Sequence, residues 1–106
     1  MKKLTKVPVK REVVKEVVTE EVNQIIEEEG GLITLLGKRV FLLCANYSYS
    51  GVLTGVNGSC ISLEDTGIVY ETGEWNLPKW KDIQKLPSKV VFIQMDAIEA
   101  FFEVNK

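Results

Sequence analysis

The apolar residues in the first third of the chain repeat with a helical period. Those between residues 12 and 29 are Val13, Val14, Val17, Val18, Val22, Ile25 and Ile26. Steps of three and four residues place side chains on one face of an α-helix, and Gly30-Gly31 follows as a typical helix end. The pattern predicts an amphipathic helix over about 12–29. Its β-branched residues are weak helix formers, so this helix needs a surface on which to pack.

Strand patterns follow the predicted helix. Residues 32–36 are apolar and predict either one more helical turn or the lead into a strand. Residues 40–45 are apolar on both alternating faces, which predicts a strand covered on both sides, by the helix and by a barrel interior. Residues 47–56 alternate again and lead through Asn57-Gly58, a strong hairpin signal, into a return strand over 59–64. The alternative is that this strand extends through 68–70 after an interruption at Gly67.

Two further strands follow a less regular segment. Residues 72–88 contain prolines that exclude one long strand, while residues 79–85 have the length of one or two helical turns. The final strands are predicted over 90–95 and 98–104, with a very short turn between them. The order is one helix, three strands, an insertion at about 72–88 and two strands. The fold class is therefore mostly β with an N-terminal α-helix.

The size of the chain fits one small domain. It has 106 residues, of which 45% are hydrophobic, enough for a single core of modest size. Gly51 and Gly55 lie inside the second strand, where glycines mark strong bending or the close approach of another backbone. We therefore expect one strongly curved domain over 12–106, with its barrel over about 32–104.

Charge is distributed unevenly, although the formal net charge is only −2. Residues 1–11 have no acid and hold Lys2, Lys3, Lys6, Lys10 and Arg11. Residues 12–29 hold Glu12, Glu16, Glu20, Glu21, Glu27, Glu28 and Glu29 against Lys15 alone. The sequence predicts a basic flexible tail and an acidic helix face. The tail is a candidate for phosphate contacts, and a solvated terminus explains it equally well.

Residue types that support catalysis or metal binding are scarce in the sequence. It has no histidine, the commonest acid-base group and metal ligand. Cys44 and Cys60 are its only cysteines and lie in apolar strands without a CxxC spacing. It has no phosphate-binding glycine loop, signal-peptide core or membrane-spanning run. We predict a cytoplasmic protein that is not an enzyme, without catalytic or metal site, cofactor, small-molecule substrate or membrane partner.

The segment from Leu36 to Asp65 resembles the first motif of the Sm-like family, which includes the bacterial Hfq branch. The matching residues are Gly37, Lys38, Arg39, Val40, Leu42, Tyr49, Gly51, Leu53 and Val56. The likeness covers residues 32–63 and, more loosely, 90–104. It implies a five-stranded, strongly bent antiparallel barrel of the SH3 type, with an N-terminal helix and an insertion between strands three and four. Members of this family assemble into rings that bind RNA.

Several positions depart from the family pattern. Cys60-Ile61 stand where the family commonly has methionine and asparagine, and that asparagine recognises the base in typical members. Met95-Asp96 stand where the family has a cation beside the RNA. Isoleucine cannot hydrogen-bond a base edge, and Asp96 would repel phosphate. We therefore expect the fold to be kept and the usual uridine pocket to be lost.

The two final strands are candidates for a subunit interface. In the family, the fifth strand of one subunit pairs with the fourth strand of the next. Here both strands are apolar and poor in the lysines and prolines that protect exposed edges. The candidate interface residues are Val90, Val91, Phe92, Ile93, Ile98, Phe101 and Phe102. We expect a homo-oligomeric ring; the alternative is a monomer whose other segments cover these edges.

The sequence thus predicts a ring-forming Sm-like protein that binds RNA or single-stranded nucleic acid outside the usual pocket. The alternative is a homo-oligomeric scaffold or protein-interaction module without nucleic-acid binding. Candidate nucleic-acid contacts are Lys2, Lys3, Lys6, Lys10, Arg11, Tyr49, Asn57, Trp75, Lys79, Trp80 and Lys81. Tryptophans mixed with lysines suit the stacking of single-stranded bases, yet packing is the favoured explanation for Trp75 and Trp80. The unusual helix and insertion would suit a phage or mobile-element protein.

Overall fold

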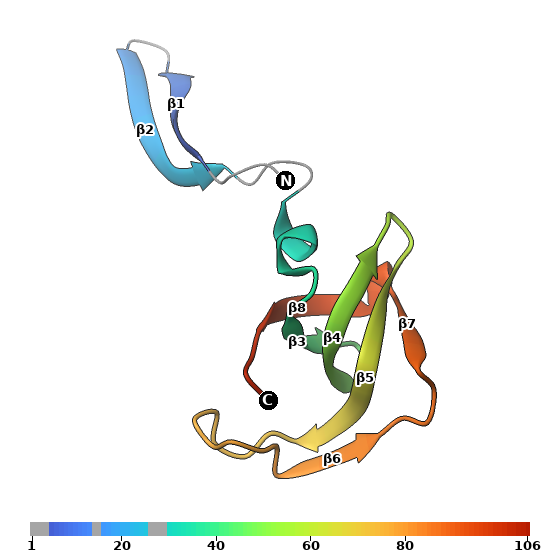
Figure 1. Ribbon diagram of the computed structural model, residues 1–106. Coiled ribbons are helices and arrows are strands. Elements are labelled where there is room, and N and C mark those ends of the chain that lie inside the picture. The colour runs from blue at the N-terminus through green and yellow to red at the C-terminus, as the bar shows by residue number, and fades with distance from the viewer. Residues whose placement is uncertain (1–4, 14–15, 26–29) are drawn as a thin grey trace. The chain divides into compact units, whose positions relative to one another are not determined.

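The computed structural model describes residues 5–13, 16–25 and 30–106 of the chain (Figure 1). Side chains are described for residues 30–106. The chain divides into two compact units, Met1–Thr34 and Leu35–Lys106, and we describe each unit by itself.

The first unit contains one antiparallel pair of strands. These are β1 (Thr5–Val13) and β2 (Glu16–Ile25). A 3-10 helix, η1 (Gly31–Leu35), follows them along the chain, and the Thr34 hydroxyl donates a hydrogen bond to the Gly31 carbonyl at 2.6 Å. Of the two alternatives for residues 32–36, the short helical turn is therefore the one found.

The helix predicted over residues 12–29 is not confirmed. Residues 16–25 form β2 and residues 12–13 end β1, whereas 14–15 and 26–29 lie outside the described residues. The valines and isoleucines of this region explain the difference, because β-branched side chains prefer extended backbone. Here that preference outweighs the helical spacing of the apolar positions.

The second unit consists of six antiparallel strands and one short 3-10 helix. In chain order they are β3 (Arg39–Cys44), β4 (Ser48–Val56), β5 (Cys60–Glu71), β6 (Asp82–Lys85), β7 (Val90–Gln94), η2 (Met95–Ala97) and β8 (Ile98–Glu103). The sheet order is β6-β5-β4-β3-β8, and β7 also pairs with β5. This confirms a mostly β domain and is consistent with a small β-barrel-like fold. None of the elements described in this unit is an α-helix.

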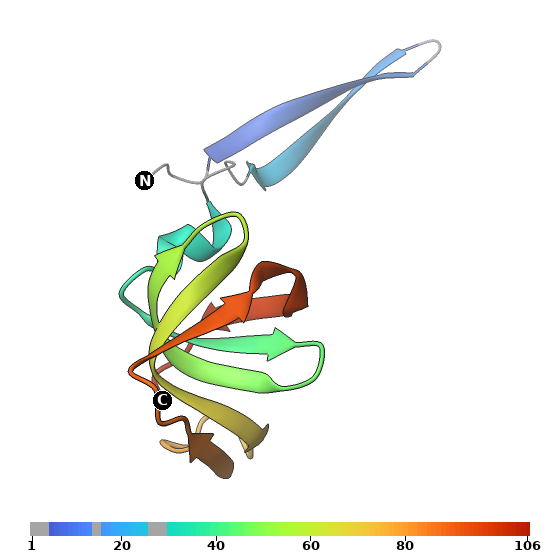
Figure 2. The same cartoon turned by 90° about the vertical axis from the view of Figure 1, so that its right-hand side faces the viewer.

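β5 has two different neighbours along one edge. Its first half, Cys60–Glu64, pairs with β7, and its second half pairs with β6 from Gly67 onward. Between the two halves lies Asp65, whose φ of 50° is rare for a residue with a side chain. In Figure 2, β6 lies at the bottom of the view and β7 lies above it. The two strands thus diverge from the point where β5 bends.

Apolar residues of four strands, β3, β4, β5 and β7, form the inner core. They are Val40, Leu42, Leu53, Ile61, Leu63 and Ile93, each at most 6% exposed. The register places Leu53 opposite Leu63, and Ile61 opposite Ile93. Ile93 was predicted as a subunit contact, but it is buried here because alternation along β7 turns it away from its exposed neighbour Phe92.

A second apolar layer covers the other face of β3. Phe41, Val69 and Trp80 form a buried cluster, against which Ile83 and Val104 pack. The outer face of β3 is therefore covered at Phe41, as its apolar pattern predicts, whereas Leu43 on the same face is 43% exposed. The cover comes from the insertion and the C-terminal segment, whereas the sequence suggested the N-terminal helix. Part of the insertion, residues 82–85, forms strand β6 and not the helical turn considered for 79–85.

Substitution of Gly51 tests the close packing of β4 against the bend of β5. A methyl group there would lie 2.9 Å from Thr66 Oγ1 and 3.1 Å from the Glu64 carbonyl oxygen. We expect Gly51→Ala to lower the free energy of unfolding in urea by about 1–3 kcal/mol, because the neighbours are buried or belong to the backbone. Gly58→Ala is the matched control: nothing lies within 4 Å of the added methyl, so a change within about 0.5 kcal/mol is expected. Equal effects at both positions would contradict this packing.

Candidate nucleic-acid interface

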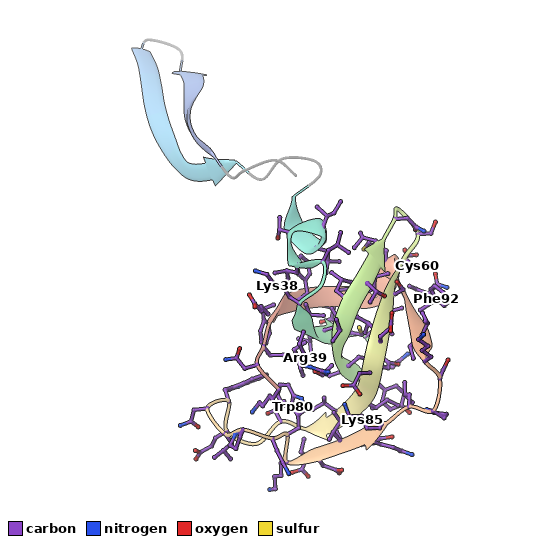
Figure 3. All side chains as sticks on the ribbon, viewed as in Figure 1. Lys38, Arg39, Cys60, Trp80, Lys85 and Phe92 are labelled. Carbon is purple, nitrogen blue, oxygen red and sulfur yellow. The ribbon has the colours of Figure 1, made fainter. Side chains whose placement is uncertain are left out.

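The two final strands each have one unpaired edge among the described residues, since β8 pairs with β3 and β7 pairs with β5. Phe92 on β7 is 69% exposed and lies at the outer side of the strand (Figure 3). On β8, Phe101 and Phe102 are 37% and 41% exposed. Val90, Val91 and Ile98 are half-buried. Except for Ile93, the predicted interface residues therefore keep solvent-exposed apolar surface.

The turn between β4 and β5 lies against the turn between β7 and β8. The Met95 amide donates a hydrogen bond to the Ser59 carbonyl at 2.8 Å. The Asn57 side-chain oxygen accepts bonds from the Ser59 and Cys60 amides at 2.7 and 2.9 Å. Ile61, next along β5, is only 1% exposed. The side-chain oxygen of Asn57 is thus bound within its own turn, and Ile61 is an apolar core residue. Neither side chain has a free oxygen that could hydrogen-bond a base.

Tyrosines line a hollow of about 340 Å³ beside β7. Its lining is Cys44, Asn46, Tyr47, Tyr49, Phe92, Ile93, Gln94 and Ala97. Tyr49, the predicted contact, is half-buried, and this burial raises the pKa of its hydroxyl. Tyr47 is 52% exposed and meets Tyr70 edge to face at 6.3 Å between ring centroids. The exposed aromatic rings of this hollow are therefore those of Tyr47 and Phe92.

A charged cluster holds the bend of β5. The Asp65 carboxylate accepts hydrogen bonds from Lys85 Nζ at 3.1 Å and from the Arg39 guanidinium, and both cations also reach its backbone oxygen. The hydrogen bonds from Lys85 and Arg39 lower the pKa of Asp65. The sequence analysis missed this cluster. The one signal for it was the interruption of the strand pattern at Gly67.

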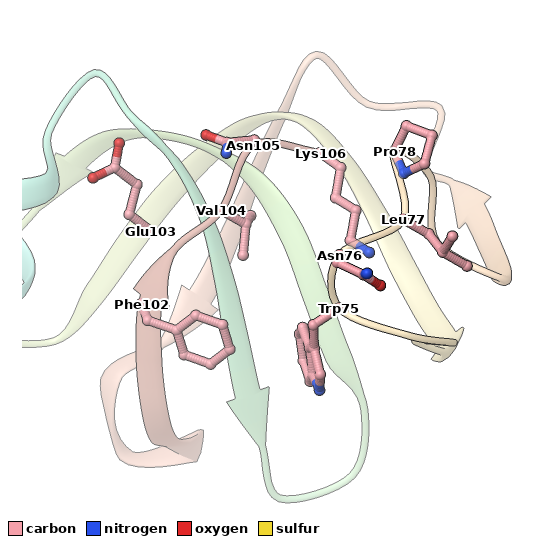
Figure 4. A pocket seen from close by; sticks show the side chains of 9 residues that line it. All are labelled: Trp75, Asn76, Leu77, Pro78, Phe102, Glu103, Val104, Asn105 and Lys106. Atoms are coloured by element: carbon pink, nitrogen blue, oxygen red, sulfur yellow. The ribbon is translucent and has the colours of Figure 1, made fainter.

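The insertion and the C-terminal segment form a pocket with a volume of about 640 Å³ (Figure 4). Its lining is Trp75, Asn76, Leu77, Pro78, Phe102, Glu103, Val104, Asn105 and Lys106. The rings of Trp75 and Phe102 lie side by side in this view, with centroids 5.5 Å apart. Trp75 is 53% exposed. We call this site the aromatic pocket.

A second pocket of about 260 Å³ shares Pro78 and Lys106 with the aromatic pocket. Its lining is Arg39, Pro78, Lys79, Trp80, Ile83, Lys85 and Lys106. Four of these side chains are cationic, and they surround an apolar floor. We call this site the cationic pocket. Figure 3 shows Arg39, Trp80 and Lys85 in the same part of the unit.

The two tryptophans of the insertion have different environments. Trp80 is 7% exposed, lies 5.2 Å from the Phe41 ring centroid and is covered by Lys106 Nζ at 4.3 Å. The predicted packing role is therefore found for Trp80, which leaves Trp75 as the accessible ring. Lys81 forms an ion pair with Glu71 at 3.3 Å. Lys79 is exposed and lines the cationic pocket.

The basic residues near the N-terminus belong to the first unit. Lys6, Lys10 and Arg11 fall in β1, whereas Lys2 and Lys3 lie outside the described residues. A strand over 5–13 replaces most of the flexible tail predicted for residues 1–11. Because the two units are not placed relative to each other, this basic segment is not assigned to either pocket.

Neither family models nor curated proteins nor solved structures match this chain. Within the described residues, no cluster of three histidine, cysteine or carboxylate side chains is arranged to hold a metal ion. Among those same residues, no helix has the length and apolar character needed to cross a membrane.

The Asp65 cluster predicts a dependence of stability on pH. The pKa of the Asp65 carboxyl in the folded state lies below its usual value. The stabilisation of the folded state by the ionised carboxylate is therefore present above about pH 4 and is lost as the pH falls through the folded-state pKa. We expect Asp65→Asn to cost no more than about 1 kcal/mol at pH 7, because the ion pairs are exposed. Asparagine also tolerates the positive φ.

The measurement is urea unfolding of wild type and Asp65→Asn from neutral to acid pH. The difference in unfolding free energy should vanish at the acid end, while the control Asp96→Asn, at another exposed carboxylate, should show no such trend. A difference for Asp65→Asn that stays constant down to the lowest pH would show that the charge of Asp65 is not the cause.

Proposed function

We propose that this chain is a subunit of a homo-oligomeric ring with a diverged Sm-like fold. The observation that carries the proposal is the pair of open edges, since β7 and β8 each pair with one neighbour among the described residues. The element order supports it in part: three strands, an insertion and two strands are found, although the insertion adds β6 as a sixth strand and no N-terminal α-helix is found among the described residues. Pairing β8 of one subunit with β7 of the next satisfies both edges, and a closed rotation axis repeats the contact.

Exposed apolar side chains favour this pairing over a monomer. Phe92 is the most exposed of the large hydrophobic residues described, and Phe102, opposite Phe41 in the register of β3 and β8, is 41% exposed. When a sheet continues antiparallel from one subunit to the next, outward residues stay on one face. Phe92 of one subunit would therefore lie beside β8 of its neighbour, and both would lose exposed apolar area.

We also propose that the ring binds RNA or single-stranded nucleic acid through surfaces other than the usual uridine pocket. The buried Ile61 and the turn-bound Asn57 argue against that pocket. Exposed Trp75 and the cationic pocket supply the aromatic ring and the cations that single strands require. A scaffold without nucleic-acid affinity is the second candidate, favoured by the modest net charge of −2.

Disruption of the edge contact tests the ring. We expect wild type to elute as one oligomer in size-exclusion chromatography with light scattering at micromolar concentration, and Phe92→Glu to elute mainly as a monomer. The reason is that a charge would be buried between subunits. Leu36→Glu is the matched control, because Leu36 is 39% exposed and lies outside both edge strands. A monomeric wild type would rule out the ring.

A titration tests nucleic-acid binding. Labelled oligo-U and oligo-A of about ten nucleotides would be titrated by fluorescence anisotropy at roughly 50 and 200 mM salt. We expect both to bind with similar affinity, because stacking and phosphate contacts tolerate any base, and both to weaken as the salt concentration rises. Failure of both oligonucleotides to bind at low salt would leave the scaffold as the function.

A further inference from the structure

The aromatic pocket and the cationic pocket are adjacent, because Pro78 and Lys106 line both, and we call the two together the groove. We propose that this groove binds single-stranded nucleic acid, with a base against Trp75 and the adjoining phosphate in the cationic pocket. The inference rests on the nucleic-acid part of the proposed function and assigns its site. That site lies away from the turns at Asn57 and Met95, where the resemblance would put it.

The exposed ring of Trp75 is held in place before any ligand arrives. Its centroid lies 5.3 Å from that of Phe41 at an interplanar angle of 87°, and 5.6 Å from that of Trp80 at 88°. Such perpendicular contacts with two neighbouring rings hold the Trp75 ring in place. With 53% of Trp75 still exposed, aromatic surface remains for a base, and stacking on a fixed ring costs little side-chain entropy.

The volume and lining of the aromatic pocket suit a nucleotide. A pocket of about 640 Å³ lies within the range of small-ligand sites. In Figure 4 the side chain of Asn76 lies between Trp75 and the end of Lys106. A carboxamide beside an aromatic ring is a suitable donor and acceptor for a base edge.

The cationic pocket supplies the phosphate contact. Lys79 is exposed, and Lys106 Nζ lies over Trp80 and donates to the Glu74 carbonyl at 3.2 Å, at the boundary between the two pockets. Arg39 and Lys85 complete the cationic lining and are bridged by Asp65. Asp65 offsets part of their charge, so Lys79 and Lys106 remain the cations most available to a phosphate.

An unstacked strand fits this groove better than a duplex. A base can reach the side of Trp75 only when it is free of its own stacking neighbours, as bases in single strands are. A ring partner paired along β8 would not fill the groove, because β8 ends at Glu103 whereas the walls at 75–78 and 104–106 lie outside that strand. Phe102 and Glu103 are the β8 residues in the lining of the groove.

The test compares matched variants of the full chain in the oligo-U titration. We expect Trp75→Ala to weaken binding by about 10-fold or more, and Trp75→Phe to restore most of the affinity because a flat ring is kept. Tyr47→Ala removes an aromatic ring of nearly equal exposure, 52%, outside the groove and should leave affinity unchanged. Thermal unfolding of each variant shows whether the fold persists.

A second pair of variants decides the question if Trp75→Ala fails to fold. Lys79→Gln should flatten the slope of log K against log salt by about 0.7, the value for one lost phosphate contact on a single strand. Lys89→Gln, an exposed lysine outside the groove, should leave the slope unchanged.

Wild-type binding that neither Trp75→Ala nor Lys79→Gln alters would overturn the groove and leave nucleic-acid binding in place. Wild type that binds no oligonucleotide would overturn both. Loss of affinity in Trp75→Ala with an unchanged salt slope in Lys79→Gln would overturn the phosphate assignment and support only the contact of a base with Trp75.

Discussion

The bend of β5 is the constraint on which the rest of the second unit depends. One edge of this strand pairs with β7 before the bend and with β6 after it, and Asp65 adopts a positive φ between the two. Because β7 pairs before the bend, it contributes Ile93 to the inner core; because β6 pairs after it, the insertion returns over Phe41. The contacts of Asp65 with Arg39 and Lys85 tie the bend to both β3 and β6. One local distortion thus positions the inner core, the outer layer and the groove.

The strands with strong alternation were predictable, and the weaker elements were not. Asn57-Gly58 and the apolar runs on either side defined β3 to β5, because a hairpin turn and a period of two are local signals. β6 has the sequence Asp-Ile-Gln-Lys, which carries no such period, and it forms only because β5 offers a free edge. For residues 12–29 two local signals disagreed, since the spacing favoured a helix and the β-branched residues favoured strands.

The candidate site was predictable only as a composition. Trp75 and Trp80 stand five positions apart with lysines between or beside them, and nothing local distinguishes them. Their different burial, 53% against 7% exposed, depends on which ring lies inside the cluster with Phe41 and Val69. Arg39 and Asp65 are in contact although 26 positions separate them in the chain. Such a contact depends on the register of the strands, which no local sequence signal provides. Phe102 was assigned to an interface because it is apolar, and its outward direction on β8 places it in the groove as well.

The burial of Ile61 and the exposed aromatic surface are connected through the core. Ile61 lies opposite Ile93 and is almost fully buried, so its side chain stabilises the core where a polar group would need a partner. Asn57 binds the amides of its own turn, so the nucleic-acid binding that we propose requires another surface. The outer face supplies one, because the insertion that covers Phe41 leaves Trp75 half-exposed beside Phe102. If subunits assemble through β7 and β8, each ring repeats this surface at regular spacing, and weak contacts with one strand multiply through effective concentration. A modest site on each subunit is then sufficient for tight binding by the assembly.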